Sequence, residues 1–168
     1  MYKVVIKLAK QKLPKTNAVR LLDQHRVEYK LMEYDVQDNQ IDGVTVAAKV
    51  GYPVTHVFKT LVTTAGTGKF FVFVIPVAGE LNLKAGAKAV GEKKIEMLPV
   101  KDLLATTGYI RGGCSPVGMK KLFPTFIDES ASNLDYMVVS AGKIGMQMKL
   151  SPNELIRVTK GRFSKLTD

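Results

Sequence analysis

The sequence predicts a single domain of the mixed α/β or α+β class. At 168 residues the chain has the size of one domain and is long enough to bury a core. Six or more strand patterns alternate with short helical patterns, and several neighbouring strands are separated only by turn residues, as in hairpins. The chain contains no internal repeat and no low-complexity linker that would divide it.

The first elements are a short strand and a helix. Residues 2–6 fit a strand or an ordered tail. Thr16 or Asn17 can cap a helix that ends near His25, because the apolar residues that follow the cap share one face. Polar and apolar residues then partly alternate over Val27–Tyr34, which predicts a strand.

A helix and a hairpin follow. Residues 38–43 are polar and form a loop, and Val44–Val50 is a short helical pattern closed by Gly51. Val54–Thr64 is rich in β-branched residues, and Lys69–Pro76 is strongly apolar. The four residues between them include two glycines, so the two strands should pair as a hairpin at the centre of a sheet.

The second half continues with short elements. Helices are expected at Leu83–Val90 and from Pro99 to Thr106, where proline suits the first helical turn. A further helix should start at Ser151-Pro152. The residues after Gly161 are basic and read as a frayed tail. The strand patterns in this half are a short segment at 95–97 and the segments Pro124–Asp128, Tyr136–Ser140 and Met146–Leu150.

Composition narrows the class of partner. Twenty-five Lys and Arg against fifteen Asp and Glu give a net charge of +10, which favours a polyanion such as nucleic acid over a merely solvated lysine surface. No apolar run approaches the roughly 20 residues that span a bilayer, so no membrane partner is expected. One cysteine excludes an intrachain disulfide and fits the cytoplasm. Two histidines and one cysteine make a zinc site improbable, and we expect no metal and no cofactor.

Two features have chemical potential. Lys59 interrupts an apolar strand, where it either reaches out to solvent or meets an anion at the mouth of a pocket. The stretch 108–118 is rich in glycine, so it is either a tight structural turn or a turn that aims backbone N–H groups at a phosphate or an oxyanion. Its Cys114 has no histidine nearby in sequence and is more typical of a buried residue than of a nucleophile. Ser115 reads as a capping hydroxyl.

Four segments together carry a family likeness: Phe58–Leu61, Leu81–Ala85, Thr107–Gly118 and Val139–Lys143. They resemble the YbaK/EbsC family, which is related to the editing domain of bacterial prolyl-tRNA synthetases. The likeness runs from about Lys15 to about Thr159, leaving residues 1–14 outside; we take 15–160 as the domain and 161–168 as a basic C-terminal tail. The resemblance implies a mixed, mainly antiparallel and partly barrel-like sheet surrounded by short helices.

The resemblance also implies a set of site residues. Lys59 matches the lysine most needed for activity, which meets the terminal adenosine, and Gly112 offers backbone groups near the scissile ester. The residues implied in substrate binding are Tyr34, Thr60, Gly113, Ser115, Pro116 and Ser140.

The implied enzyme is a trans-editing aminoacyl-tRNA deacylase acting on Cys-tRNA(Pro). In the family's route the cysteine thiol attacks its own ester, and the protein supplies orientation and an oxyanion hole. The implied partners are tRNA and, in addition, prolyl-tRNA synthetase. Ala141, Ile144 and Gln147 depart from the family pattern, and Gln147 replaces a frequent acidic residue. Alanine or another small amino acid, and a non-catalytic tRNA-binding module, therefore stay open as alternatives.

Overall fold

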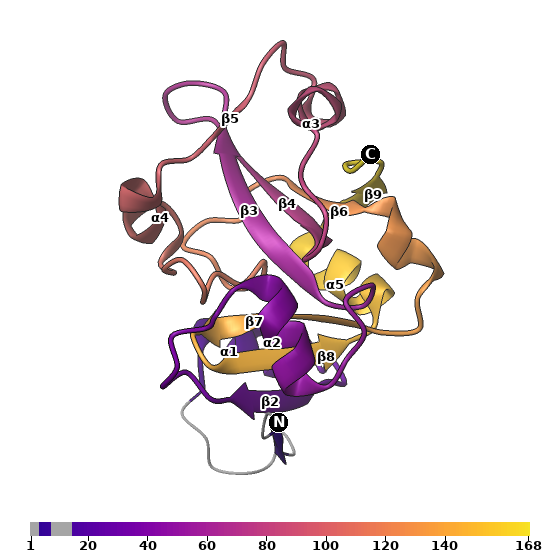
Figure 1. Cartoon of the computed structure of the whole chain (residues 1–168). Helices are drawn as coiled ribbons and strands as arrows, with labels where there is room; N and C mark the ends of the chain where they lie inside the picture. The colour runs from indigo at the N-terminus through magenta and orange to yellow at the C-terminus, as the bar shows by residue number, and fades with distance from the viewer. Residues whose placement is uncertain (1–3, 8–14) are drawn as a thin grey trace.

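The strands of the computed structural model, which describes residues 4–7 and 15–168, form two sheets (Figure 1). The four-stranded sheet is antiparallel throughout and has the order β1-β2-β8-β7. It consists of β1 (Val4–Lys7), β2 (Lys30–Tyr34), β8 (Met146–Leu150) and β7 (Met137–Lys143). A register shift between Ser140 and Lys143 interrupts the pairing near the β7–β8 turn.

The five-stranded sheet is mixed and has the order β5-β3-β4-β6-β9. Strands β3 and β4 form the expected hairpin, whereas β4–β6 and β6–β9 are parallel pairs. The prediction of a mixed α/β domain is confirmed, and the strands divide between two sheets that do not close into a barrel. The members are β5 (Glu96–Met97), β3 (Phe58–Thr64), β4 (Phe70–Pro76), β6 (Thr125–Asp128) and β9 (Arg162–Ser164).

Strand β3 links the two sheets. It runs from the four-stranded sheet at one end of the molecule toward the hairpin at the other (Figure 1). Val57, just before β3, forms an isolated parallel bridge with Val138 of β7. The strand itself begins at Phe58 instead of the expected Val54, because residues 54–56 form a turn after Pro53.

Four short helices start directly after a polar capping residue, as predicted for Thr16 and Ser151. Thr16, Asp42, Asn82 and Ser151 each accept a hydrogen bond from the backbone N–H three residues further on, which satisfies a donor that the helix leaves unpaired. The helices are α1 (Asn17–Gln24), α2 (Gly43–Val50), α3 (Leu83–Val90), α4 (Val100–Thr107) and α5 (Pro152–Thr159), and a 3₁₀ turn occupies Glu129–Asn133.

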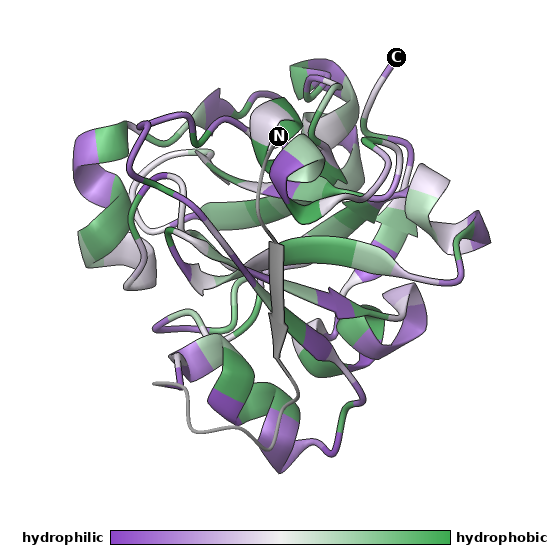
Figure 2. Cartoon of the chain, turned by 60° about the horizontal axis from the view of Figure 1, so that its bottom comes forward, coloured by the Kyte–Doolittle hydropathy of each residue, from purple (hydrophilic) through white to green (hydrophobic). Residues whose placement is uncertain are grey.

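Two clusters of the core cover the two faces of the four-stranded sheet, and others pack on the five-stranded sheet. Leu22 of α1 and Leu155 of α5 pack with Met148 on one face, and Val46 of α2 packs with Met32 and Val138 on the other. Figure 2 shows hydrophobic residues concentrated in the central strands and hydrophilic ones mostly in the surrounding loops and helices. Burial of these side chains drives the packing at roughly 25 cal/mol per Å² of apolar surface.

The C-terminal residues differ from the expected frayed tail. They form β9, and Leu166 is fully buried. The reason is the buried carboxylate of Asp128 at the end of β6, whose Oδ1 accepts hydrogen bonds from the backbone N–H groups of Leu166 and Thr167 at 3.0 and 3.2 Å. At the other end, the expected strand at residues 2–6 falls partly outside the described residues, and Val4–Lys7 forms β1.

Candidate active site

A cavity of about 760 Å³, here called the inter-sheet cavity, is lined by residues of both sheets. Strands β2, β8 and β7 contribute Tyr34, Gln147 and Ser140, and β3 contributes Phe58–Leu61. The remaining walls come from residues 39–43 before and at the start of α2 and from the glycine-rich stretch. Segments far apart in sequence therefore meet around one space.

The register of the four-stranded sheet brings three of these side chains to one face. Ser140 lies directly opposite Gln147, and Gln147 lies opposite Met32, two residues before Tyr34. Because side chains two apart on a strand share a face, Tyr34, Gln147 and Ser140 lie side by side across three adjacent strands. They form the polar floor of the cavity.

Three buried polar atoms lining this cavity have no hydrogen-bond partner among the described residues. They are the Tyr34 hydroxyl, the Thr60 hydroxyl and the Gln147 Oε1 atom. Burial also raises the pKa of Tyr34, so its hydroxyl stays protonated and able to donate. Since a buried polar group without a partner is costly, this clustering indicates a place where a ligand supplies the missing bonds.

The charged residues around the cavity are mainly positive. Lys59 and Arg111 line it, and Asp42 supplies the carboxylate. The Asp42 Oδ1 atom is already engaged at 3.0 Å with the backbone N–H of Thr45 as the cap of α2. Two cations facing one engaged carboxylate suit an anionic ligand such as a phosphodiester.

The glycine-rich stretch enters the cavity through a tight turn. The Gly113 N–H donates to the Ile110 carbonyl at 3.0 Å, and Gly112 has a φ of +86°, a value that favours glycine. The Tyr109 hydroxyl donates to the Val117 carbonyl at 2.7 Å and fixes the far side of the stretch. The turn is thus a rigid wall that presents the backbone of Gly112 without a side chain.

Five of the eight residues expected in the site line the inter-sheet cavity. They are Lys59, Gly112, Tyr34, Thr60 and Ser140. Lys59 and Gly112, which are distant in sequence, therefore face one space as expected. Their chemical roles remain predictions.

The other three expected residues lie outside the lining. A Cβ at Gly113 would be 2.8 Å from the Ile144 backbone nitrogen, so this glycine serves the close approach of the β7–β8 turn. Ser115 is buried, and its Oγ accepts a hydrogen bond from the Val117 N–H at 3.2 Å, which closes a local turn in the loop and caps no helix among the described residues. Pro116 lines a separate cavity of about 250 Å³. These residues shape the wall and do not face the cavity.

Cys114 lines the cavity but is unsuited to nucleophilic attack. Burial raises the pKa of its thiol from 9.0 to about 12, although the Thr107 hydroxyl acts in the opposite direction. At neutral pH the thiol is therefore protonated, and the thiolate is the reactive form. This agrees with its interpretation as a small buried residue.

Sequence reasoning missed Arg111 and Gln147 as cavity residues. Arg111 lies inside a quoted motif, and its neighbour Gly112 could have indicated it. Gln147 was noted only as a departure from an acidic pattern. The alternation along Met146–Leu150 predicts only that Gln147 shares a face with Lys149. That Gln147 lies opposite Ser140 follows from the pairing of β8 with β7, which the sequence does not show.

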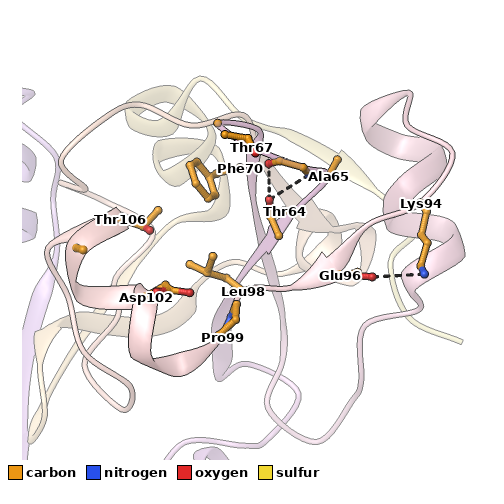
Figure 3. A pocket seen from close by; sticks show the side chains of 13 residues that line it. Thr64, Ala65, Thr67, Phe70, Lys94, Glu96, Leu98, Pro99, Asp102 and Thr106 are labelled. Carbon is orange, nitrogen blue, oxygen red and sulfur yellow. Dashed lines mark hydrogen bonds and ion pairs between the residues drawn. The ribbon is translucent and has the colours of Figure 1, made fainter.

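A second cavity of about 670 Å³, the hairpin cavity, lies between the β3–β4 turn, β5 and α4 (Figure 3). Phe70, Leu98 and Thr106 gather around it. Lys94 and Glu96 are exposed and form an ion pair with each other at 3.4 Å. It contains none of the eight expected site residues.

Comparison with known proteins identifies the class. The family described as "Aminoacyl-tRNA editing domain" matches residues 41–158, and the chain belongs to this family, so the resemblance drawn from its motifs is confirmed. Among curated proteins it is similar to one of Enterococcus faecalis named "Putative Cys-tRNA(Pro)/Cys-tRNA(Cys) deacylase EbsC". The two are 48% identical over 161 residues, which cover 95% of this chain and 98% of the relative.

Two solved structures share the fold. One is described as "Crystal structure of a putative trans-editing enzyme for prolyl tRNA synthetase", with a TM-score of 0.78, 20% identity, and coverage of 90% of this chain and 95% of that one. The other, "hypothetical protein APE2540", has a TM-score of 0.82 and 20% identity over 91% of this chain and all of that one. No helix among the described residues is long and apolar enough to cross a membrane.

Proposed function

We propose that this protein is a trans-editing deacylase that removes cysteine from mischarged Cys-tRNA(Pro) in the inter-sheet cavity. The observation that carries the proposal is the meeting of Lys59, Gly112 and three buried polar atoms in one cavity of an aminoacyl-tRNA editing domain. Those three atoms have no partner in the part of the chain that the structure describes. The 48% identity to a protein named for Cys-tRNA deacylation favours cysteine over other small amino acids.

The need for such a site is energetic. A synthetase pocket distinguishes similar small side chains by only about 1–3 kcal/mol, which leaves misacylated tRNA to be cleared elsewhere. In this proposal Lys59 binds a phosphate or ribose oxygen of the terminal adenosine. The polar floor then orients the aminoacyl group beneath it. The terminal adenosine does not vary between substrates, so its binding places whichever amino acid is attached to it.

In the proposed chemistry the substrate supplies its own nucleophile. The cysteine thiol attacks the ester carbonyl, a C–S bond forms, and the C–O bond to the ribose breaks. The thiol proton passes to the departing ribose oxygen, and a thiolactone leaves. The backbone N–H of Gly112, which donates no hydrogen bond to the described residues, would stabilise the developing oxyanion. The protonated state of Cys114 supports a route that needs no protein thiolate.

tRNA is the proposed partner, and the net charge of +10 suits its phosphates. Prolyl-tRNA synthetase is a second proposed partner that would select the tRNA, since the cavity has room only for its end. Cytoplasm is the compartment that such substrates imply.

One assay set tests the function. Deacylation of Cys-tRNA(Pro), Ala-tRNA(Pro) and Pro-tRNA(Pro) is measured with wild type and with Cys114→Ala. We expect cysteine to be released fastest and Cys114→Ala to retain activity. Faster release of alanine would reassign the substrate, and binding of charged tRNA without ester loss would favour a tRNA-binding module. Loss of activity in a folded Cys114→Ala would contradict the mechanism.

A further inference from the structure

The loop between β2 and α2, residues 35–42, forms one wall of the inter-sheet cavity. Four of its residues, 39–42, line the space. Ile41 reaches the glycine-rich turn, because a Cβ placed on Gly112 would lie 3.0 Å from the Ile41 Cδ1 atom. The loop and the turn therefore meet beside the proposed ester position. Two apolar side chains, Ile41 and Ile144, meet the turn at that junction, and of these Ile41 lines the cavity.

A fully buried lysine holds this loop in place. Lys49 of α2 is 0% exposed, and its Nζ donates to the Asp35 carbonyl oxygen and to Asp38 Oδ1, each at 2.7 Å. The same ammonium lies 5.9 Å from the centre of the Tyr34 ring, in the cavity floor. Lysine is almost never fully buried unless it is paired. One buried charge thus ties the loop to α2 and to the floor.

Local hydrogen bonds also fix the loop residues on either side of Ile41. Asp38 Oδ1 also accepts from the Gln40 N–H at 3.0 Å, immediately before Ile41. Asp42, immediately after Ile41, is fixed as the cap of α2 by its bond to the Thr45 N–H. Ile41 is therefore held between two anchored residues. An irregular loop without such bonds would sample many positions of this side chain.

We propose that Ile41 sets the largest amino-acid side chain that the cavity admits, and that Lys49 is the positioning residue that keeps Ile41 there. This inference rests on the proposed function and adds its specificity determinant. A wall of fixed position rejects a larger side chain by overlap, which is a stronger filter than weak attraction to a small one. Substitutions that remove Ile41 or loosen its loop should therefore change the ratio of affinities for large and small amino acids more than they change the affinity for the small one.

The test measures binding directly, so that it is independent of catalytic rate. The probes are three hydrolysis-resistant analogues in which alanine, cysteine or leucine is amide-linked to 3′-amino-3′-deoxyadenosine at the end of a CCA trinucleotide. Their Kd values are measured by calorimetry. In wild type we expect the leucyl analogue to bind at least about tenfold more weakly than the cysteinyl one. In Ile41→Ala the ratio should fall below about threefold because the leucyl analogue binds more tightly.

Lys49→Met keeps the length of the side chain and removes its charge. It should lower the ratio of leucyl to cysteinyl Kd, as Ile41→Ala does. Asp38→Asn weakens the same ion pair from its more exposed side and serves if Lys49→Met does not fold. The matched control is Lys69→Met, which removes an exposed ion pair with Glu92 away from the cavity and should leave the ratio unchanged.

Two outcomes would overturn the inference alone. One is a wild type that binds all three analogues equally. The other is an unchanged ratio in Ile41→Ala and in the folded variant of the Lys49–Asp38 pair, including the case in which all three analogues weaken equally. Failure of wild type to deacylate any of the charged tRNAs would overturn the proposed function and this inference together. If wild type deacylates Cys-tRNA(Pro) but the ratio of leucyl to cysteinyl Kd is the same in the variants, the inference fails and the proposed function stands.

Discussion

The inter-sheet cavity and the hairpin cavity have similar volumes, about 760 and 670 Å³, but differ in how their polar groups are satisfied. In the hairpin cavity Lys94 pairs with Glu96, and the Thr64 hydroxyl donates to the Gly66 carbonyl at 2.8 Å. In the inter-sheet cavity three buried polar atoms have no partner among the described residues.

This difference teaches that volume alone does not mark a site in this fold. In a cavity whose polar groups already bond to each other or to water, no polar group needs a hydrogen bond from a ligand. A cavity with buried hydroxyls and an amide oxygen left without partners carries an energetic penalty of about 1–3 kcal/mol per group, which a ligand can relieve. Lys59 and Arg111 add the charge that an anionic ligand needs.

The largest contrast is expected between two lysines. Lys59→Ala should lower kcat/KM for Cys-tRNA(Pro) by at least about 100-fold, because it removes a cation that orients the reacting end. Lys94→Ala, in the hairpin cavity, should leave kcat/KM within about twofold of wild type. Deacylation assays on both purified proteins decide the matter. Equal losses in the two variants would end the distinction between the cavities.

A pair of glycines provides the second contrast. Gly112 and Gly68 have similar positive φ values of +86° and +77°, but a Cβ at Gly68 meets nothing within 4 Å, whereas one at Gly112 approaches Ile41. Both substitutions by alanine should therefore lower the free energy of unfolding by about 1–3 kcal/mol through backbone strain. Gly112→Ala alone should also lower kcat/KM, by about 10- to 100-fold. Urea unfolding and deacylation rates measure the two effects, and full activity in Gly112→Ala would remove this residue from the site.

The third contrast uses hydroxyl groups. Tyr34→Phe deletes a buried hydroxyl that has no partner among the described residues, so stability should stay unchanged or rise by up to about 1 kcal/mol while kcat/KM falls about tenfold. Thr64→Val deletes a hydroxyl that is bonded, so it should lose about 0.5–1 kcal/mol and keep its activity. Thermal unfolding and steady-state rates test both. A Tyr34→Phe protein that loses stability and keeps activity would reverse the interpretation of the cavity floor.

The effect confined to alkaline pH concerns the buried thiol of Cys114. Because burial raises its pKa from 9.0 to about 12, the folded protein holds this proton more tightly than the unfolded chain does. The contribution of this thiol to the free energy of unfolding is fully present below about pH 9. It is lost as the pH rises toward about 12, at up to about 1.4 kcal/mol per pH unit.

Urea unfolding of wild type and Cys114→Ala between about pH 8 and about pH 10 measures this slope. Burial and the neighbouring Cys114 both raise the pKa of Tyr109, to about 12, so the substitution also changes this group, and the difference reports the thiol together with its coupling to Tyr109. The alkaline loss should be shallower in Cys114→Ala. Identical slopes would show that the thiol does not titrate as its burial requires.

Local signals made much of the fold predictable. The helix caps Thr16, Asn82 and Ser151 act within three residues, and the hairpin between β3 and β4 is fixed by its turn residues. Strand β9 escaped prediction because its pairing depends on a parallel partner and on Asp128, both more than 30 residues away in sequence.

The candidate site was predictable where a residue contradicts its surroundings. Lys59 in an apolar strand and Gly112 in a glycine-rich turn both stand out in the sequence. Gln147 and Ile41 do not, because their positions depend on the register of β8 with β7 and on the ion pair between the buried Lys49 and Asp38. Gly113 was expected in the cavity and instead packs against the β7–β8 turn, a contact that no local pattern encodes.

The most direct test of the inter-sheet cavity as the binding site is an NMR titration of the ¹⁵N-labelled protein with the cysteinyl amide-linked CCA analogue. We expect the backbone amide signals of Thr60, Gly112 and Gln147 to shift with a common Kd, while those of Gly66 and Thr67 stay in place. Shifts confined to Gly66 and Thr67, or no shift at Gly112 under saturating analogue, would contradict the account.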